Sequence, residues 1–176
     1  MAFVRIKYIK NRGGKSYPYA YVVENKWKGK KVVQKVSKYL GRVYEFKRED
    51  AKEFTAFLRT SLESYAARAK NPSILADLVS WTLESHGFSK RGEWLYRDSL
   101  KVSPSSGEVL ANKKPAVLHM DDGFLCKHTI TRLKRFGRTG NEEKDMFRLA
   151  VAFVESGIKV PKDILVEFYT HAPKNI

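Results

Sequence analysis

Three stretches near the N-terminus decide how this chain begins to fold. They read AFVRIKYI at residues 2–9, YPYAYVVE at residues 17–24 and KVVQKVSKYL at residues 31–40. Apolar and polar residues alternate in the first stretch, which is typical of a β-strand. Residues 11–14 and 27–30 separate the stretches as turns, and Gly29 can supply a positive φ. The pattern predicts a three-stranded antiparallel meander whose third strand ends at Gly41.

Beyond residue 48 the spacing of apolar residues becomes helical, and glycines and caps divide the chain. We expect Asn71 and Asn141 to cap helices, and Gly87 and Gly157 to follow helix ends. The predicted helices cover residues 49–70, 72–86, 124–136, 142–156 and 161–171. Residues 93–120 look extended and are interrupted by turn-forming segments, so they predict strands.

These elements predict an α+β fold. It would contain the N-terminal meander, a helical pair, a small second antiparallel sheet and C-terminal helices. Charge and periodicity both change near residue 48. We therefore expect a basic β-rich module at residues 1–48 and an α+β body at residues 49–176.

The charge of the chain is concentrated in its first part. The net charge of the whole chain is +15. Residues 1–48 contain fourteen basic and two acidic residues, so they have a net charge of +12. So uneven a distribution creates a local field and predicts a polyanionic partner, of which nucleic acid is the commonest. An anionic membrane surface is less favoured, because this region shows no amphipathic basic helix.

Composition also narrows the cellular setting. The sequence has no apolar run long enough to predict a membrane span, and its N-terminus lacks the apolar stretch of a signal peptide. Cys126 is the only cysteine among 176 residues. An intramolecular disulfide is therefore impossible, and a reducing, cytoplasmic location is the simplest expectation.

The N-terminal module interleaves cations with aromatic residues, as a nucleic-acid surface requires. Lys and Arg neutralise phosphates, and exposed aromatic rings stack on bases. The residues that we expect to contact phosphates are Lys10, Arg12, Lys15, Lys26, Lys28, Lys30 and Lys31. Tyr17, Tyr19 and Trp27 are the expected stacking residues. Two alternatives stay open: the tyrosines could cover an adjacent helix, and the lysines could be merely solvated.

A second basic cluster lies within residues 127–138. Arg132, Lys134 and Arg135 lie off the apolar stripe of the predicted helix. They could extend the binding surface, although an ordinary solvated helix face is the favoured interpretation.

The sequence offers no convincing catalytic or metal-binding set. His119, Cys126 and His128 lack the spacing of common zinc ligands. Asp121 and Asp122 have no spaced third carboxylate, so a role in a turn or helix cap is favoured. We therefore expect no enzymatic activity, no metal and no cofactor.

Several short motifs in the first 41 residues together resemble a known module. They are FVRIK at residues 3–7, YAYVVE at 19–24, GK at 29–30, QK at 34–35 and KYLG at 38–41. They resemble the N-terminal leader of some DDE-type insertion-sequence transposases and of short prokaryotic, often archaeal, proteins. The resemblance implies contact with DNA. It does not imply transposition, because residues 49–176 are too short for the catalytic domain and show no three-acid arrangement.

We therefore expect a non-enzymatic nucleic-acid-binding protein, with DNA slightly favoured. One alternative is an RNA-binding factor, associated with the ribosome or another nucleoprotein. Another is an enzyme acting on nucleic acid through a site that the sequence does not reveal. Self-association as a homodimer through the apolar face of residues 142–156 also stays open.

Overall fold

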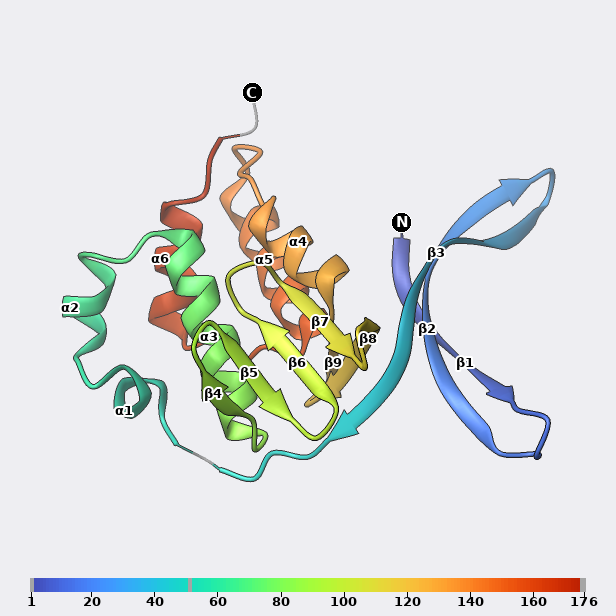
Figure 1. The fold of residues 1–176 in the computed structure, drawn as a ribbon. Helices are drawn as coiled ribbons and strands as arrows, with labels where there is room; N and C mark the ends of the chain where they lie inside the picture. Colours follow the sequence, from blue (N-terminus) through green and yellow to red (C-terminus); the bar gives the residue numbers. More distant parts are fainter. Residues whose placement is uncertain (1, 51, 175–176) are drawn as a thin grey trace.

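A long three-stranded ribbon forms the N-terminal part of the molecule. The computed structural model describes residues 2–50 and 52–174. β1 (Ala2–Lys10), β2 (Ser16–Lys28) and β3 (Lys31–Phe46) pair in antiparallel order, which confirms the predicted meander. Figure 1 shows that the two hairpins of this ribbon project away from the rest of the molecule.

Helices and short strands form the remainder, which confirms the α+β class. The helices are α1 (Phe54–Leu58), α2 (Leu62–Ala66), α3 (Asn71–Ser85), α4 (Lys127–Lys134), α5 (Glu142–Ser156) and α6 (Lys162–Thr170). The strands are β4 (Ser89–Arg91), β5 (Trp94–Arg97), β6 (Leu100–Ser103), β7 (Glu108–Ala111), β8 (Lys114–Met120) and β9 (Gly123–Leu125). We call residues 52–174 the body.

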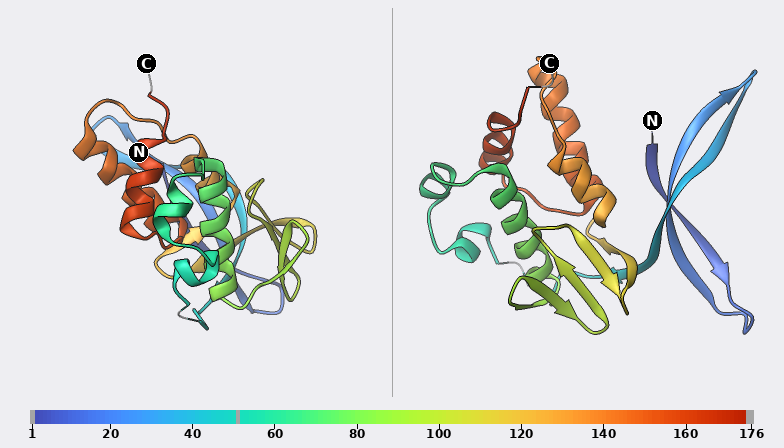
Figure 2. Two further views of the ribbon diagram at one scale, coloured as in Figure 1. Left: turned by 90° about the vertical axis from the view of Figure 1, so that its left-hand side faces the viewer. Right: turned by 45° about the horizontal axis from the view of Figure 1, so that its top comes forward.

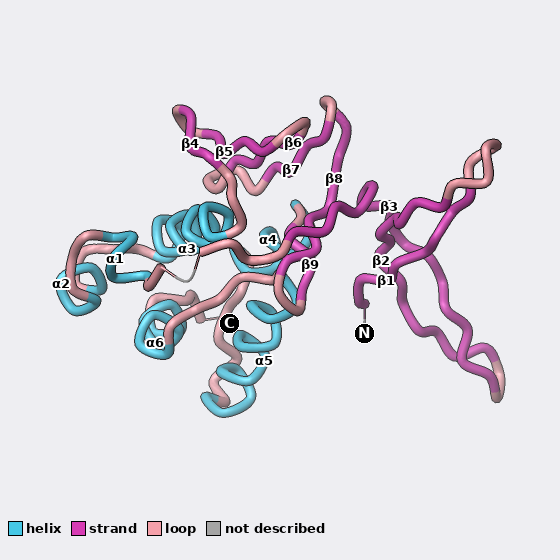
Figure 3. The backbone as a smooth tube through the Cα atoms, turned by 90° about the horizontal axis from the view of Figure 1, so that it is seen from below, coloured by secondary structure: helices cyan, strands magenta, loops and turns pink. Residues whose placement is uncertain are grey.

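One sheet runs through both parts of the molecule. Its strand order is β1-β2-β3-β8-β7-β6-β5-β4, with β9 paired to β8. The end of β3, residues 42–46, pairs in parallel with residues 116–120 of β8. The sheet therefore crosses the expected boundary near residue 48, and the strands predicted as a second sheet are continuous with the N-terminal meander. Figure 3 shows β4–β7 on one side of the helices, with β8 leading toward the ribbon.

Gly41 does not end the third strand, contrary to the prediction. β3 continues through it to Phe46. Gly41 has a φ of 131°, and a Cβ added there would lie 2.3 Å from the carbonyl oxygen of Pro115. Glycine therefore permits the backbones of β3 and β8 to approach closely at this point.

The single helix predicted over residues 49–70 is also wrong, because two short helices, α1 and α2, occupy this segment. α1 stops at Arg59, which has a left-handed φ of 55°. The hydroxyl of Ser61 then accepts a hydrogen bond from the backbone N–H of Ser64 and caps α2. Serine favours caps over helix interiors for this reason.

The other helix boundaries differ less from the prediction. α4 begins at Lys127 rather than 124, because residues 123–125 form β9 and pair with β8. Asn71 is inside α3 instead of capping it, and Lys70 is the N-cap. Asn141 caps α5 by accepting from the N–H of Lys144, and Gly157 ends it with a φ of 68°. Both predictions for α5 are confirmed.

Two apolar clusters stabilise the fold. The larger joins α3, α4, α5 and α6 to β5–β8, and its fully buried members include Leu78, Leu118 and Phe153. The smaller contains Val22 of β2 and Val117 of β8, and it attaches the ribbon to the body. None of the described helices is long and apolar enough to cross a membrane. On α5, Phe147 and Val154 are exposed, and self-association through this helix stays a prediction.

Candidate nucleic-acid interface

The candidate interface is the fork, by which we mean residues 2–40 of β1, β2 and β3. Its β1–β2 arm ends in a turn at residues 11–14, and its β2–β3 arm ends in a turn at residues 29–30. Gly14 and Gly29 have φ values of 78° and 62° in these turns. The pairing of β2 with β3 is irregular at Ala20/Tyr21 and at Val22/Val23. Such irregularities increase strand twist, and Figure 2 shows the two arms diverging.

The predicted phosphate-contacting residues lie at the ends of the two arms. Lys10, Arg12 and Lys15 are on the β1–β2 arm, and Lys26, Lys28, Lys30 and Lys31 are on the β2–β3 arm. All seven are exposed. Within the described residues 2–47 the one ion pair joins Lys26 to Glu24, at 3.9 Å. The positive charge of the arms is therefore almost entirely uncompensated.

The end of the β2–β3 arm combines charge with exposed apolar surface. The Trp27 side chain is 77% exposed, and its cross-strand partner Val32 is 51% exposed. Lys28 and Lys31 lie directly opposite each other in the ladder. Like charges in such a pair destabilise a hairpin. A polyanionic ligand would remove that repulsion and could cover the Trp27 ring.

Tyr17, Tyr19 and Tyr21 share one face of β2 and are partly exposed. Tyr39 of β3 extends this face, with its ring centroid 6.2 Å from that of Tyr19 and 5.4 Å from that of Tyr21. Burial, together with the neighbouring tyrosines, raises the pKa of Tyr39. The rings of Tyr19, Tyr21 and Tyr39 are neighbours, and Tyr17 lies on the same face of β2; we call these four residues the tyrosine face.

Cations lie above the rings of the tyrosine face. The Arg42 guanidinium is 4.2 Å from the centroid of Tyr17, and Lys15 Nζ is 5.7 Å from the same ring. Lys7 Nζ is 5.4 Å from the centroid of Tyr21. Cation–π contacts of this kind hold the cations beside the rings. Cationic and aromatic groups are therefore adjacent on this surface.

The opposite face of β2 attaches the fork to the body. Ala20 and Val22 are buried there with Val117 of β8 and Cys126. The tyrosines of β2 therefore do not cover an adjacent helix, which was the alternative left open by the sequence. The small side chains pack instead on Val117 of β8 and on Cys126, and the tyrosines lie on the other face of β2.

Five residues of this surface are absent from the predicted set. They are Arg5, Lys7, Tyr21, Tyr39 and Arg42. Strand alternation places Arg5 and Lys7 on one side of β1, but it does not show which side meets the tyrosines. That information lies in the register, which pairs Arg5 with Tyr21 and Arg42 with Tyr19.

The residues of the second basic cluster, Arg132, Lys134 and Arg135, lie in different surroundings. Arg132 donates a hydrogen bond to the carboxylate of Glu155 and is neutralised by it. Arg132 and Arg135 line a cavity of about 600 Å³ beside α5. Lys134 instead lines a separate cavity and donates to the carbonyl oxygen of Ser105. These three predicted site residues do not form one continuous surface with the arm tips.

Asp121 lies in the turn between β8 and β9. Its ion pair with Arg48 connects this turn of the body to the segment that follows β3. Its carboxylate accepts a hydrogen bond of 2.9 Å from Arg48, and its other oxygen is 3.6 Å from Nε2 of the buried His86. Burial alone would raise the pKa of Asp121, but the hydrogen bond and charge of Arg48, together with His86 and Lys159, lower it. The carboxylate is therefore part of a structural ion pair.

His119, Cys126 and His128 do not form a ligand set. The His119 ring stacks on Phe124 with centroids 4.9 Å apart. Cys126 is buried and lies 3.6 Å from the hydroxyl of Thr129. Burial and the charges of Arg132 and Lys38 lower the pKa of His128. Over residues 2–50 and 52–174, no three His, Cys, Asp or Glu side chains are grouped so that they could hold a metal ion.

Comparison of the chain with models of protein families, with curated proteins and with solved structures found no match.

Proposed function

We propose that the fork binds nucleic acid without catalysing a reaction, and that DNA is its preferred ligand. One observation supports this most strongly. Seven exposed basic residues lie on two projecting β-arms, and almost none is paired with an acid. Contacts from such residues go mainly to phosphates, which give affinity and positioning more than sequence specificity.

The shape of the β2–β3 arm favours duplex DNA. The major groove of B-form DNA is wide enough to admit a two-stranded β-ribbon. The corresponding groove of A-form RNA is deep and narrow, so side chains on a ribbon cannot read it. An arm in the groove would bring Lys26, Lys28, Lys30 and Lys31 close to the phosphates on either side. Trp27 would then contact base edges.

The tyrosine face supports a second candidate, single-stranded RNA. Aromatic side chains on a β-sheet stack on unpaired bases, and neighbouring cations contact the backbone. Tyr17, Tyr19, Tyr21 and Tyr39, with Arg42 and Lys7, meet both requirements. A partner such as the ribosome or another nucleoprotein would present this type of ligand.

Fluorescence anisotropy with labelled single- and double-stranded DNA and RNA tests the proposal. Each ligand is titrated at about 50 and about 200 mM salt, because phosphate contacts weaken strongly as salt rises. The test variant changes Lys26, Lys28, Lys30 and Lys31 to Ala. We expect salt-sensitive binding by the wild-type protein, tightest for duplex DNA, and a loss of at least about tenfold in the variant.

A matched control removes the same charge from the body. It changes Lys90, Lys144, Lys162 and Lys174 to Ala, all of which are exposed. If charge alone governs affinity, both variants weaken binding equally and the fork is not the site. Absence of binding to all four ligands at both salt concentrations would refute the proposal. Preference for single-stranded RNA would select the second candidate.

A further inference from the structure

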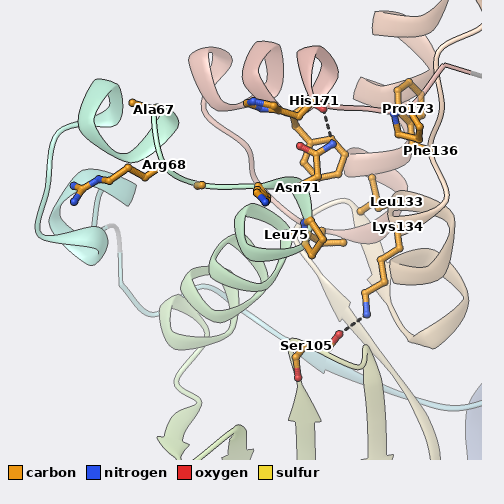
Figure 4. Close-up of a pocket in the computed structure, with 14 residues that line it drawn as sticks. Ala67, Arg68, Asn71, Leu75, Ser105, Leu133, Lys134, Phe136, His171 and Pro173 are labelled. Carbon is orange, nitrogen blue, oxygen red and sulfur yellow. Dashed lines mark hydrogen bonds between the residues drawn. The ribbon is translucent and has the colours of Figure 1, made fainter.

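A cavity of about 680 Å³ opens in the body among α2, α3, α4 and α6. Figure 4 shows its lining residues. They come from the segment that joins α2 to α3, from the first turns of α3, from the C-terminal ends of α4 and α6 with the residues that follow them, and from Ser105 in the turn after β6. No residue of β1, β2 or β3 lines it. Its volume is in the range of about 300–1,000 Å³ that small-molecule sites occupy.

The floor of the cavity is apolar. Leu75, Leu133, Phe136 and Phe168 line it, and each of these side chains is less than 10% exposed. They belong to the main core, so their positions are held by packing on the far side. Such a floor favours a flat or compact apolar group over a strongly hydrated one.

Asn71 supplies an unpartnered hydrogen-bond acceptor at this floor. Its Nδ2 donates to the carbonyl oxygen of Phe168 at 2.8 Å, which fixes the orientation of the carboxamide. Its Oδ1 is buried and has no hydrogen-bond partner within the described chain. Figure 4 shows the carboxamide between α3 and α6. A buried acceptor without a donor is unfavourable, so a ligand N–H or O–H would be stabilised there.

The charge of the cavity is positive. Its lining includes Lys70 and Lys134, and none of its fourteen residues is Asp or Glu. Lys134 extends across the cavity toward Ser105 and donates to its carbonyl oxygen (Figure 4). Arg68 also belongs to the lining, but its guanidinium donates to Ser64 and points away. Lys134 is therefore the cation best placed to meet an anionic ligand group.

We propose that this cavity binds a small amphipathic anion. The ligand would combine an apolar ring on the leucine and phenylalanine floor with a carboxylate, phosphate or sulfonate beside Lys134. A donor group would satisfy Asn71 Oδ1. This site is separate from the fork and does not depend on the function proposed for it.

The full-length chain can be tested with 8-anilinonaphthalene-1-sulfonate, which has an aromatic body, one anionic group and an N–H donor. We expect saturable binding with one molecule per chain and a rise in fluorescence. Lys134→Gln should weaken the binding about tenfold, because it removes the cation that meets the sulfonate. Ala67→Trp, at an exposed position on the rim, should fill the opening and prevent binding.

Two control variants locate the probe. Lys162→Gln removes a charge outside the cavity, and Trp27→Ala removes the most exposed aromatic ring of the fork. Neither should change the affinity. Shifts of the backbone amide resonances of Leu75 and Leu133 in an NMR titration should accompany binding, and the spectra also show that each variant is folded. Binding that is unchanged in Lys134→Gln and Ala67→Trp, or that is lost in Trp27→Ala, would overturn the proposal, as would the absence of saturable binding.

Discussion

Apolar side chains have opposite environments in the body and in the fork. Leu118 and Phe153 of the body are at most 1% exposed, whereas Trp27 and Val32 of the β2–β3 arm are more than half exposed. A two-stranded ribbon has no second layer against which to bury such side chains, and it gains little stability from them. The body therefore supplies most of the stability of the fold, and the exposed side chains of the fork are accessible to a ligand.

The largest expected difference between the two regions is in stability. Leu118→Ala should reduce the free energy of unfolding by about 2–5 kcal/mol, because it removes a fully buried side chain and leaves a cavity. Val33→Ala, at a position 46% exposed on the arm, should change it by no more than about 0.5 kcal/mol. Urea denaturation followed by circular dichroism measures both. Equal losses would show that the arm is buried against something in solution.

Substitutions at the junction between the fork and the body should have the next largest effect on stability. Gly41→Ala should destabilise the chain by about 2–3 kcal/mol, because the added Cβ would meet the Pro115 carbonyl and the positive φ disfavours an L side chain. Gly29→Ala is the matched control. Gly29 also has a positive φ, but no atom lies within 4 Å of its added Cβ, so a cost of about 1 kcal/mol is expected. If the two variants have equal stability by denaturation, β3 does not approach β8 as closely as the structure shows.

Binding of nucleic acid should depend on the fork more than on the body, which is the reverse of the order expected for stability. Trp27→Ala should weaken binding of the preferred nucleic acid by about 1–3 kcal/mol, the range measured for stacking aromatic residues. The folding stability of the variant should stay close to that of the wild type, because the exposed ring buries little apolar surface. Anisotropy and denaturation on the same sample compare the two effects. Trp27→Phe should retain most of the affinity, and a Trp27→Ala variant that binds normally would exclude the ring from the interface.

The smallest expected effect concerns the Asp121–Arg48 pair and depends on pH. The pKa of Asp121 is lowered in the folded chain, so its carboxylate stabilises the fold above its unfolded pKa of about 4. That contribution is lost as the pH falls through the lowered value. Asp121→Asn should therefore cost up to about 1 kcal/mol at pH 7, and less as the pH falls below 4.

Asn is a suitable replacement because it tolerates the left-handed backbone that Asp121 adopts, with a φ of 48°. Denaturation of the wild type and the variant at pH 7 and near pH 3 measures the change. A difference in stability that is the same at both pH values would show that the charge of Asp121 is not responsible for it.

Local patterns predicted much of the fold correctly. Alternation predicted the strands of the fork, and Asn141 and Gly157 correctly marked the two ends of α5. The helix over residues 49–70 failed because helix propensity did not reveal the left-handed stop at Arg59. For the candidate interface, composition identified the basic arms, but it missed Arg42 and Tyr39. The register between β2 and β3 places both residues beside the tyrosines of β2, and no pattern within a short stretch of sequence specifies that register.

Short stretches of sequence were enough to predict the strand periodicity, the turns and the concentration of charge in the first 48 residues, because each depends on residues that are neighbours along the chain. Tertiary structure alone decided the parallel pairing of β3 with β8, the close approach at Gly41 and the hydrogen bond from Asn71 to Phe168. These contacts join residues 70 or more positions apart. They form only when the whole core packs, because packing must offset the entropy of closing such long loops.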